Sequence, residues 1–145
     1  MIFAINAGAM RRVYNLQRGL RDKYGLVKNP WQADIEGAMA EMAVAKAFDV
    51  FWSGSIGKLH AMDAGNYQVR YTPYETGHLV LNPADDDSQT FIFVTGGDGQ
   101  YHLRGYAIAG EVKLEEFYTS KVPGRYAYFV PQDMLRPIEE LRNNQ

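Results

Sequence analysis

The 145-residue sequence contains no cysteine. Disulfide bonds, thiolate zinc sites and iron–sulfur clusters are therefore excluded, and the absence fits a reducing cytosol. Histidine is scarce as well, because only His60, His78 and His102 occur and they form no His-x-x-x-His pair. Two of them fall in predicted strands, where structural roles are favoured over metal or base roles. The sequence also has no Gly-x-Ser-x-Gly elbow and no phosphate-binding loop ending in Gly-Lys-Ser/Thr.

Long hydrophobic runs are missing too. The apolar opening, residues 1–6, is too short for a signal peptide, and Arg11 and Arg12 follow it rather than precede it. No stretch approaches the roughly 18 apolar residues of a membrane span. We therefore expect no membrane partner and a cytoplasmic location.

The sequence has no large excess of charge of either sign, since the formal net charge is −2. The distribution is uneven, however. Residues 1–30 carry six basic side chains and one acid, whereas the rest of the chain carries nine basic side chains and sixteen acids. One basic element on an acidic body indicates either a phosphate-facing arm or a solvated helix face. In the first case Arg11, Arg12 and Arg18 are the candidate nucleic-acid contacts.

Two helices are expected in the first third of the chain. Apolar residues at helical spacing predict an amphipathic helix over residues 7–25, whose core-facing stripe contains Met10, Val13, Tyr14, Leu20 and Tyr24. The arginines lie mostly off this stripe. Asn29 and Pro30 are typical of a capped helix start and predict a second helix over residues 30–48.

Glu41 is the unusual residue of the second predicted helix. The polar residues of this helix share no single face, which predicts that it is enclosed on most sides. The helical neighbours of Glu41 (Gly37, Ala38, Val44 and Ala45) cannot pair with a carboxylate. Because an unpaired buried charge is costly, Glu41 should meet a cation, a metal ion or a water-filled cleft; the alternative is a structural ion pair with a distant Arg or Lys.

The pattern changes to strands after residue 50. Apolar and alternating runs predict strands at 50–52, 67–72, 78–81, 90–95, 101–108 and 126–130, a hairpin turn at 96–99, a helical turn at 113–118 and a terminal helix at 137–142. Helices followed by a run of strands indicate an α+β fold. The length favours one domain over residues 1–145, with the basic helix at about 7–25 and the core at about 30–135.

The strand at residues 67–72 carries the strongest chemical signal. Side chains alternate along a strand, so Tyr67, Val69 and Tyr71 form an apolar face. Gln68 and Arg70 point to the opposite face, and the carboxylate of Asp63 enters from the preceding turn. Polar side chains on a strand that is otherwise core-like mark a candidate site.

Two other acidic patterns compete with this site. The adjacent acids at residues 85–87 could bind a cation, but three carboxylates in one turn repel one another and are usually solvated. Glu111 and Lys113 form a literal Glu-x-Lys pair, yet they follow Gly110 late in the chain and far from Asp63. We therefore favour Asp63, Gln68 and Arg70.

Together with Glu41, these residues resemble the PD-(D/E)XK nuclease-like superfamily, and in particular a small phage-associated branch of uncharacterised proteins. The similarity extends over about residues 10–135. It is carried by the helix at 37–46, the strand that follows Asp63, the acidic turn at 85–87 before the apolar strand 91–94, the Gly105-Tyr106 pair and the segment 128–131. The resemblance implies a restriction-endonuclease-like core, in which helices precede and pack on a mixed central sheet. For a phage-encoded protein, it also implies location in the host-cell cytoplasm.

The resemblance also implies a metal site. Asp63 would be the main ligand of Mg²⁺ or Mn²⁺, Gln68 would stand where the family usually has an acid, and the carbonyl of Val69 could also ligate. Arg70 would replace the family lysine, and Glu41 would complete the metal or water shell. A metal-bound water can attack phosphorus while the metal offsets charge on the phosphate oxygens. Gln68 removes one negative charge from this site, and Arg70 cannot act as a base.

Three functions follow as hypotheses. The first is a metal-dependent nuclease that cleaves DNA phosphodiester bonds. The second is a nuclease-like fold that no longer cuts and serves as a DNA- or protein-binding module. The third is a structural or assembly protein with an incidental polar cluster. DNA is the expected partner for the first two, and a homodimer is compatible with the sequence.

Overall fold

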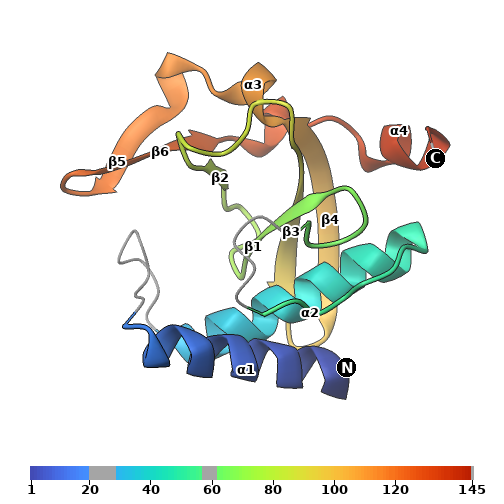
Figure 1. Cartoon of the computed structure of the whole chain (residues 1–145). Helices are drawn as coiled ribbons and strands as arrows, with labels where there is room; N and C mark the ends of the chain where they lie inside the picture. Colours follow the sequence, from blue (N-terminus) through green and yellow to red (C-terminus); the bar gives the residue numbers. More distant parts are fainter. Residues whose placement is uncertain (20–28, 57–61, 145) are drawn as a thin grey trace.

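The computed structural model describes residues 1–19, 29–56 and 62–144, and these residues form an α+β fold. Two long helices, α1 (Ile2–Gln17) and α2 (Pro30–Phe48), precede all the strands. The helices lie side by side, and α2 lies between α1 and the strands (Figure 1). Of the helices in the described residues, none is long and apolar enough to cross a membrane.

The strands form two three-stranded sheets. The first sheet has the order β1-β3-β4 and is mixed, because β1 (Gln68–Thr72) runs parallel to β3 (Thr90–Gly97) and β4 (Gln100–Ile108) runs antiparallel to it. The second sheet is antiparallel and has the order β2-β6-β5. Its strands are β2 (Leu79–Leu81), β5 (Tyr118–Val122) and β6 (Arg125–Val130). Short helices complete the fold: α3 (Ala109–Val112), η1 (Glu115–Phe117), η2 (Gln132–Met134) and α4 (Ile138–Asn143).

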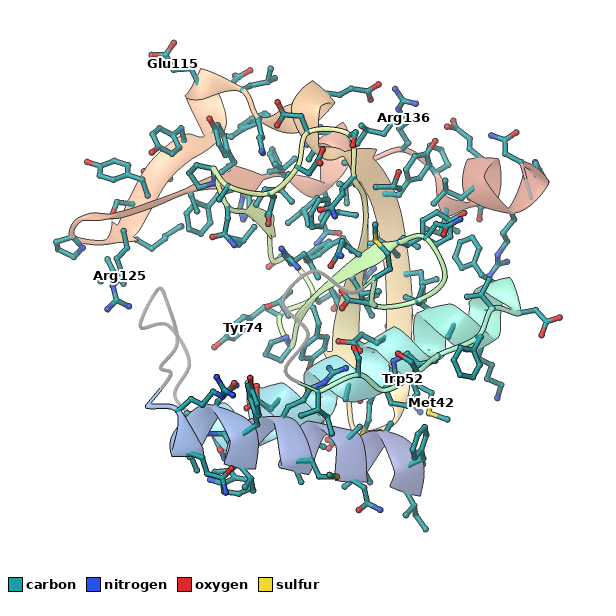
Figure 2. All side chains as sticks on the ribbon, viewed as in Figure 1. Met42, Trp52, Tyr74, Glu115, Arg125 and Arg136 are labelled. Atoms are coloured by element: carbon teal, nitrogen blue, oxygen red, sulfur yellow. The ribbon has the colours of Figure 1, made fainter. Side chains whose placement is uncertain are left out.

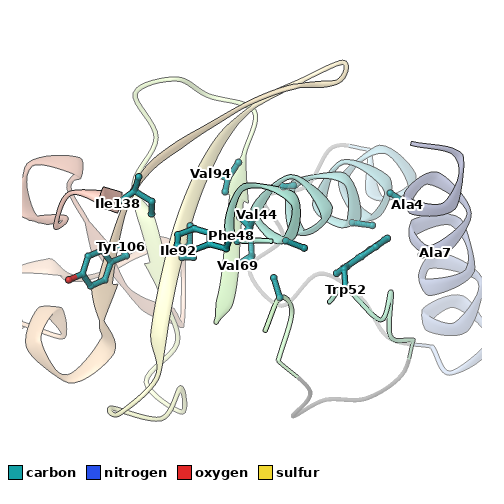
Figure 3. Close-up of a cluster of buried hydrophobic side chains, with 14 residues drawn as sticks. Ala4, Ala7, Val44, Phe48, Trp52, Val69, Ile92, Val94, Tyr106 and Ile138 are labelled. Carbon is teal, nitrogen blue, oxygen red and sulfur yellow. The ribbon is translucent and has the colours of Figure 1, made fainter. Parts of the chain in front are cut away.

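The second helix forms as its sequence predicts. The Asn29 side chain accepts a hydrogen bond from the backbone N–H of Gln32 at 3.2 Å, and Pro30 occupies the first helical position. Both features satisfy or remove backbone donors that the first turn leaves unpaired. Helix α1 on one side and the first sheet on the other enclose α2 (Figure 3), as expected from its lack of a single polar face.

The first helix differs from its prediction in bounds and in orientation. It begins at Ile2 and ends at Gln17, and Gly19 follows with a φ of +66°. Met10 and Val13, predicted to face the core, are 58% and 44% exposed. The buried face consists of the small residues Ala4, Ala7 and Gly8 together with Arg12. Small side chains let α1 approach α2 closely, and this close approach decides the orientation. The predicted stripe residues Leu20 and Tyr24 lie outside the described residues.

Strand β3 lies at the centre of the first sheet and contributes to a core on each of its faces. Ile92 and Val94 pack with Val44 and Phe48 of α2 in the first core (Figure 3). On the opposite face, Phe91 packs with the buried side chains of the second sheet in a second core. The prediction of a central strand that is apolar on both faces is therefore confirmed.

The turn predicted at residues 96–99 joins β3 to β4. Asp98 and Gly99 have φ values of +53° and +85°, as a tight two-residue hairpin requires. The pair of residues next to the turn in the β3–β4 ladder is Gly97 with Gln100. The terminal helix is also confirmed as α4. The prediction for residues 113–118 is met only by the short η1.

Several other elements were predicted wrongly or missed. Residues 50–52 are not a strand. Trp52 is buried while its neighbour Phe51 is 85% exposed, so this apolar run contributes the ring of Trp52 to the core and not that of Phe51. Strand β5 was missed because it is an edge strand with few buried side chains, and edge strands are often polar. The helical turn α3 was missed as well.

The contact between α1 and α2 can be tested at Gly8. A Cβ at this position would lie 2.4 Å from the Cα of Ile35 and 2.6 Å from the carbonyl oxygen of Asp34, so the two helix backbones would have to separate. We expect Gly8→Ala to lower the free energy of unfolding by about 1–3 kcal/mol, as overpacking does. Gly37→Ala is the matched control, because a Cβ there meets nothing within 4 Å. It should stabilise the protein by up to about 1 kcal/mol through helix propensity. Equal effects in chemical denaturation would contradict the close approach.

Candidate functional site

Strand β1 lies at the edge of the first sheet, where both of its faces border other elements. Val69 is buried in the first core, and Tyr67 and Tyr71 pack against the same core. Arg70 points to the opposite face, where its guanidinium lies 4.7 Å from the centre of the Phe91 ring. The predicted alternation of apolar and polar faces is confirmed. It also means that Gln68 and Arg70 leave β1 on the face opposite to α2.

Glu41 lies on α2, is 8% exposed and meets a cation. The guanidinium of Arg11 donates two hydrogen bonds to it, Nη1 to Oε1 and Nη2 to Oε2, each at 2.7 Å. The indole N–H of Trp52 donates a third to Oε2 at 3.1 Å. Of the two readings of Glu41, the structure therefore bears out the alternative, an ion pair with a distant arginine.

Arg11 also donates a hydrogen bond to the backbone. Its Nε donates to the carbonyl oxygen of Ser55 at 2.9 Å. Burial alone would lower the pKa of Arg11, but the hydrogen bonds to Glu41 and its negative charge outweigh this effect and raise the pKa. The pair is therefore a fixed, bidentate and largely desolvated contact, the geometry in which arginine binds carboxylates most strongly.

The three arginines predicted to contact nucleic acid differ in position. Arg11 pairs with Glu41, and Arg12 is 9% exposed with its Nη1 at 3.7 Å from an Asp34 carboxylate oxygen. Arg18 is exposed, and its guanidinium lies 4.8 Å from the centre of the Tyr14 ring. Two of the three thus point toward α2. A DNA contact through these residues stays a prediction.

Asp63 lies in the turn before β1 and accepts a hydrogen bond from the backbone N–H of Val69 at 2.8 Å. Burial, followed by repulsion from Glu41, raises its pKa to about 6. The Val69 N–H, Arg70 and Arg11 act in the opposite direction and limit the rise. Asp63 therefore lies within electrostatic range of Glu41 and of both arginines, which is the part of the predicted constellation that the fold brings together.

Arg70 is held on its own side of the sheet by Asp85. Its Nη2 lies 3.2 Å from each carboxylate oxygen of Asp85, and the backbone N–H of Asn82 donates to the same carboxylate at 2.7 Å. The acidic turn at residues 85–87 does not point its carboxylates at one place. Asp86 accepts from the Ser88 N–H at 2.8 Å, and Asp87 pairs with Lys113 at 2.7 Å.

The competing Glu-x-Lys pair is not on a strand. Glu111 lies in α3 and pairs with Arg136 at 2.5 Å. Lys113 ends the same turn and donates to the Asp85 carbonyl oxygen and to the Asp87 carboxylate. The two side chains thus bind different partners, as structural residues do.

The residues proposed as metal ligands do not form one donor set. Both oxygens of Glu41 already accept hydrogen bonds, and one oxygen of Asp63 does. The amide nitrogen of Gln68 donates to the Met62 sulfur at 3.5 Å. Within the described ranges, no group of three His, Cys, Asp or Glu side chains is placed to hold one metal ion. Magnesium in proteins is bound through one or two carboxylates and keeps several waters, so metal binding at Asp63 and Glu41 stays a prediction.

A cleft of about 870 Å³ runs past the edge of β1 and between the helices and the second sheet. Glu41, Val69 and Arg70 line it together, because a cleft at an edge strand can reach both faces of that strand. On its other side lie Lys121 and Phe129, with the Lys121 ammonium 5.3 Å from the Phe129 ring centre. Figure 2 shows Tyr74 between the strands and the helices.

Sequence reasoning missed the cleft and two partners of the site. The wall of the cleft is contributed by α2 and by strands of both sheets, β1, β2, β3, β5 and β6, which are spread along the sequence. Trp52 was assigned to a strand and Asp85 to a solvated turn, yet each binds a predicted site residue. Asp85 follows Asn82 by three residues, a spacing at which an aspartate side chain often binds nearby backbone. This spacing does not predict that Asp85 also pairs with Arg70.

The pairing of Arg11 with Glu41 predicts a large loss of stability in Glu41→Gln. The substitution leaves the buried guanidinium without a counter-charge, which costs about 3–5 kcal/mol when a buried ion pair is broken. Glu111→Gln is the matched control, because both side chains of the Glu111–Arg136 pair are nearly half exposed, and exposed ion pairs contribute little to stability. Urea denaturation measures both. Similar losses in the two variants would show that Arg11 and Glu41 do not form a buried pair.

The raised pKa of Asp63 predicts how the free energy of unfolding depends on pH. The dependence has the opposite sign to that caused by a salt-bridged acid. A folded-state pKa of about 6, above the ordinary 3.8, favours folding while Asp63 is protonated. This contribution is complete below pH 3.8 and is lost as the pH rises through about 6. Asp63→Asn keeps an acceptor for the Val69 N–H and removes the titration. We expect it to gain stability relative to the wild type between pH 4 and pH 8, by at most about 3 kcal/mol. A difference that does not change with pH would contradict the shift.

Comparisons of the chain with protein-family models, with curated proteins and with solved structures give no match. The resemblance to PD-(D/E)XK nucleases therefore stays a prediction, and the α+β fold rests on the structure alone.

Proposed function

We propose that the protein is a DNA-binding module that holds single-stranded DNA in its cleft and uses no catalytic metal ion. The observation that carries this proposal is the composition of the cleft wall, where the rings of Tyr74 and Phe129 lie with the ammonium group of Lys121. Proteins that bind single-stranded nucleic acid combine aromatic rings, on which bases stack, with cations that follow the backbone. Tyr74 is 68% exposed, so its ring is accessible for stacking.

The charges around the cleft favour binding at the β5–β6 side. The charge of Glu41 is balanced by Arg11, and that of Arg70 by Asp85. Lys121 lies on this side of the cleft, over the ring of Phe129. Phosphates would therefore meet Lys121, while the bases meet the rings.

The absence of metal chemistry is part of the same proposal. A nuclease of the PD-(D/E)XK type requires free carboxylate oxygens at the positions of Asp63 and Glu41, whereas Arg11 and Trp52 hold both oxygens of Glu41. A helix that precedes a mixed sheet, and an acid directly before its edge strand, support a nuclease-like fold. We propose that this fold is retained and that the guanidinium of Arg11 takes the charge-balancing part of a metal.

The DNA proposal is tested by fluorescence anisotropy with a labelled oligothymidine of about 12 nucleotides. Lys121→Ala should weaken binding and reduce the slope of log K against log salt by about 0.7, the value for one phosphate contact on a single strand. Lys46→Ala is the matched control: Lys46 is exposed near the end of α2, so its removal changes net charge equally without altering the cleft wall. Equal effects of the two variants, or no binding by the wild type, would reject the cleft as a DNA site.

A second candidate is the metal-dependent nuclease, and the position of Asp63 favours it. Asp63 lies in the turn directly before the edge strand β1, within electrostatic range of Glu41. Titration calorimetry with MgCl₂ and MnCl₂, followed by cleavage assays on single-stranded, duplex and branched DNA, separates the candidates. We expect neither metal binding nor cleavage. Metal-dependent cleavage that Asp63→Ala abolishes would replace the binding-module proposal with the nuclease.

A further inference from the structure

The outward face of α1 carries large apolar side chains from its first turn to its last. Its exposed large side chains range from 44% exposure at Val13 to 75% at Ile2 and include Phe3, Met10 and Leu16. At 100° per residue these side chains lie within one face of the helix, opposite to Ala4, Ala7 and Gly8. Monomeric proteins rarely expose a contiguous apolar surface of this kind unless it binds something.

The same face carries no charge. Helix α1 contains no acid, and its only basic residues are Arg11 and Arg12. Arg11 pairs with Glu41 of α2, and Arg12 is 9% exposed, so neither guanidinium stands on the outward face. A surface helix normally places charged residues outward. Here the arrangement is reversed, with the arginines inward and the hydrophobic side chains outward.

The spacing of the outward residues is that of a helix–helix seam. Phe3, Asn6, Met10, Val13 and Gln17 are separated by three, four, three and four residues, which is the heptad spacing of packed helices. Ile2 and Leu16 flank this seam. A membrane surface would instead favour a helix with outward Lys or Arg beside its apolar face, and α1 has none. The seam therefore indicates another helix as the partner.

We propose that this helix is α1 of a second copy, packed antiparallel about a two-fold axis. Met10 is the midpoint of the seam between Phe3 and Gln17, so the axis would pass near Met10 and bring it against Met10 of the other copy. An uncharged face suits self-association, because two identical charged faces would place like charges together. The proposal is independent of the DNA function and of the cleft.

The size of the surface indicates a weak interface. Helix α1 has 16 residues and is therefore about 24 Å long. One helix pair of this length lies at or below the lower end of specific interfaces, about 1,200 Å² in total, where association is weak and transient. We therefore expect a dissociation constant in the micromolar range.

Charge substitutions at the axis test the dimer. In sedimentation velocity between about 1 and 100 µM, the wild-type chain should shift from monomer to dimer. Met10→Glu and Met10→Lys should each remain monomeric, because each places two like charges at the axis. Mixed in equal amounts, the two variants should recover a dimer, which a merely misfolded variant could not do. Met134→Glu is the matched control, because Met134 is also exposed but lies in η2, and it should dimerise like the wild type.

Three outcomes would overturn the proposal. One is a wild-type chain that stays monomeric over the whole range, whether or not it binds phosphatidylcholine vesicles. Another is a Met10→Glu variant that dimerises as the wild type does. The third is a mixture of the two Met10 variants that stays monomeric although circular dichroism shows both to be folded.

Discussion

The bidentate contact between Arg11 and Glu41 is the interaction on which the arrangement of the helices depends. Glu41 lies on a helix enclosed by α1 and the first sheet, and its neighbours on α2 offer no donor. Only a side chain from another element can compensate its charge, and Arg11 does so from α1 while also binding Ser55. Because a buried carboxylate without a partner costs several kcal/mol, α1 must present its arginine side to α2.

That constraint explains why α1 has its hydrophobic side chains outward. A helix with large apolar residues on one side and small residues with arginines on the other can pack in only one of two ways. The small side, with Gly8 against the α2 backbone, allows the close contact that brings Arg11 within 2.7 Å of Glu41. Packing through Met10 and Val13 would hold the helices apart and leave Glu41 unpaired. The buried ion pair and the exposed apolar face thus both follow from the packing of α1 on α2 through its small residues.

Local patterns in the sequence predict the elements whose cause is local. Asn29 and Pro30 start α2, Asp98 and Gly99 form the hairpin, and alternation along β1 buries Val69 and turns Arg70 away. Local patterns fail where a residue distant in sequence determines which side of an element is buried. The stripe on α1 was assigned to the core because periodicity shows which residues share a face but not which face is covered. Trp52 looked like part of a strand because nothing nearby in sequence indicates its bond to Glu41.

The candidate site shows the same division, and this limits what a degenerate motif can imply. Asp63, Gln68 and Arg70 lie within eight residues of one another in the sequence, but a strand sends Val69 to one face and its neighbours to the other. Arg70 therefore reaches Asp85 and the Phe91 ring, while Glu41 lies beyond the opposite face. Asp63 lies within electrostatic range of groups on both faces of the sheet. Glu41 therefore raises the pKa of Asp63, while Arg70 and Arg11 lower it. A metal centre would need these groups to converge. Here each acid instead has its own donor, Arg11 for Glu41 and the Val69 N–H for Asp63. The proposed phosphate contact therefore falls to the other side of the cleft, at Lys121.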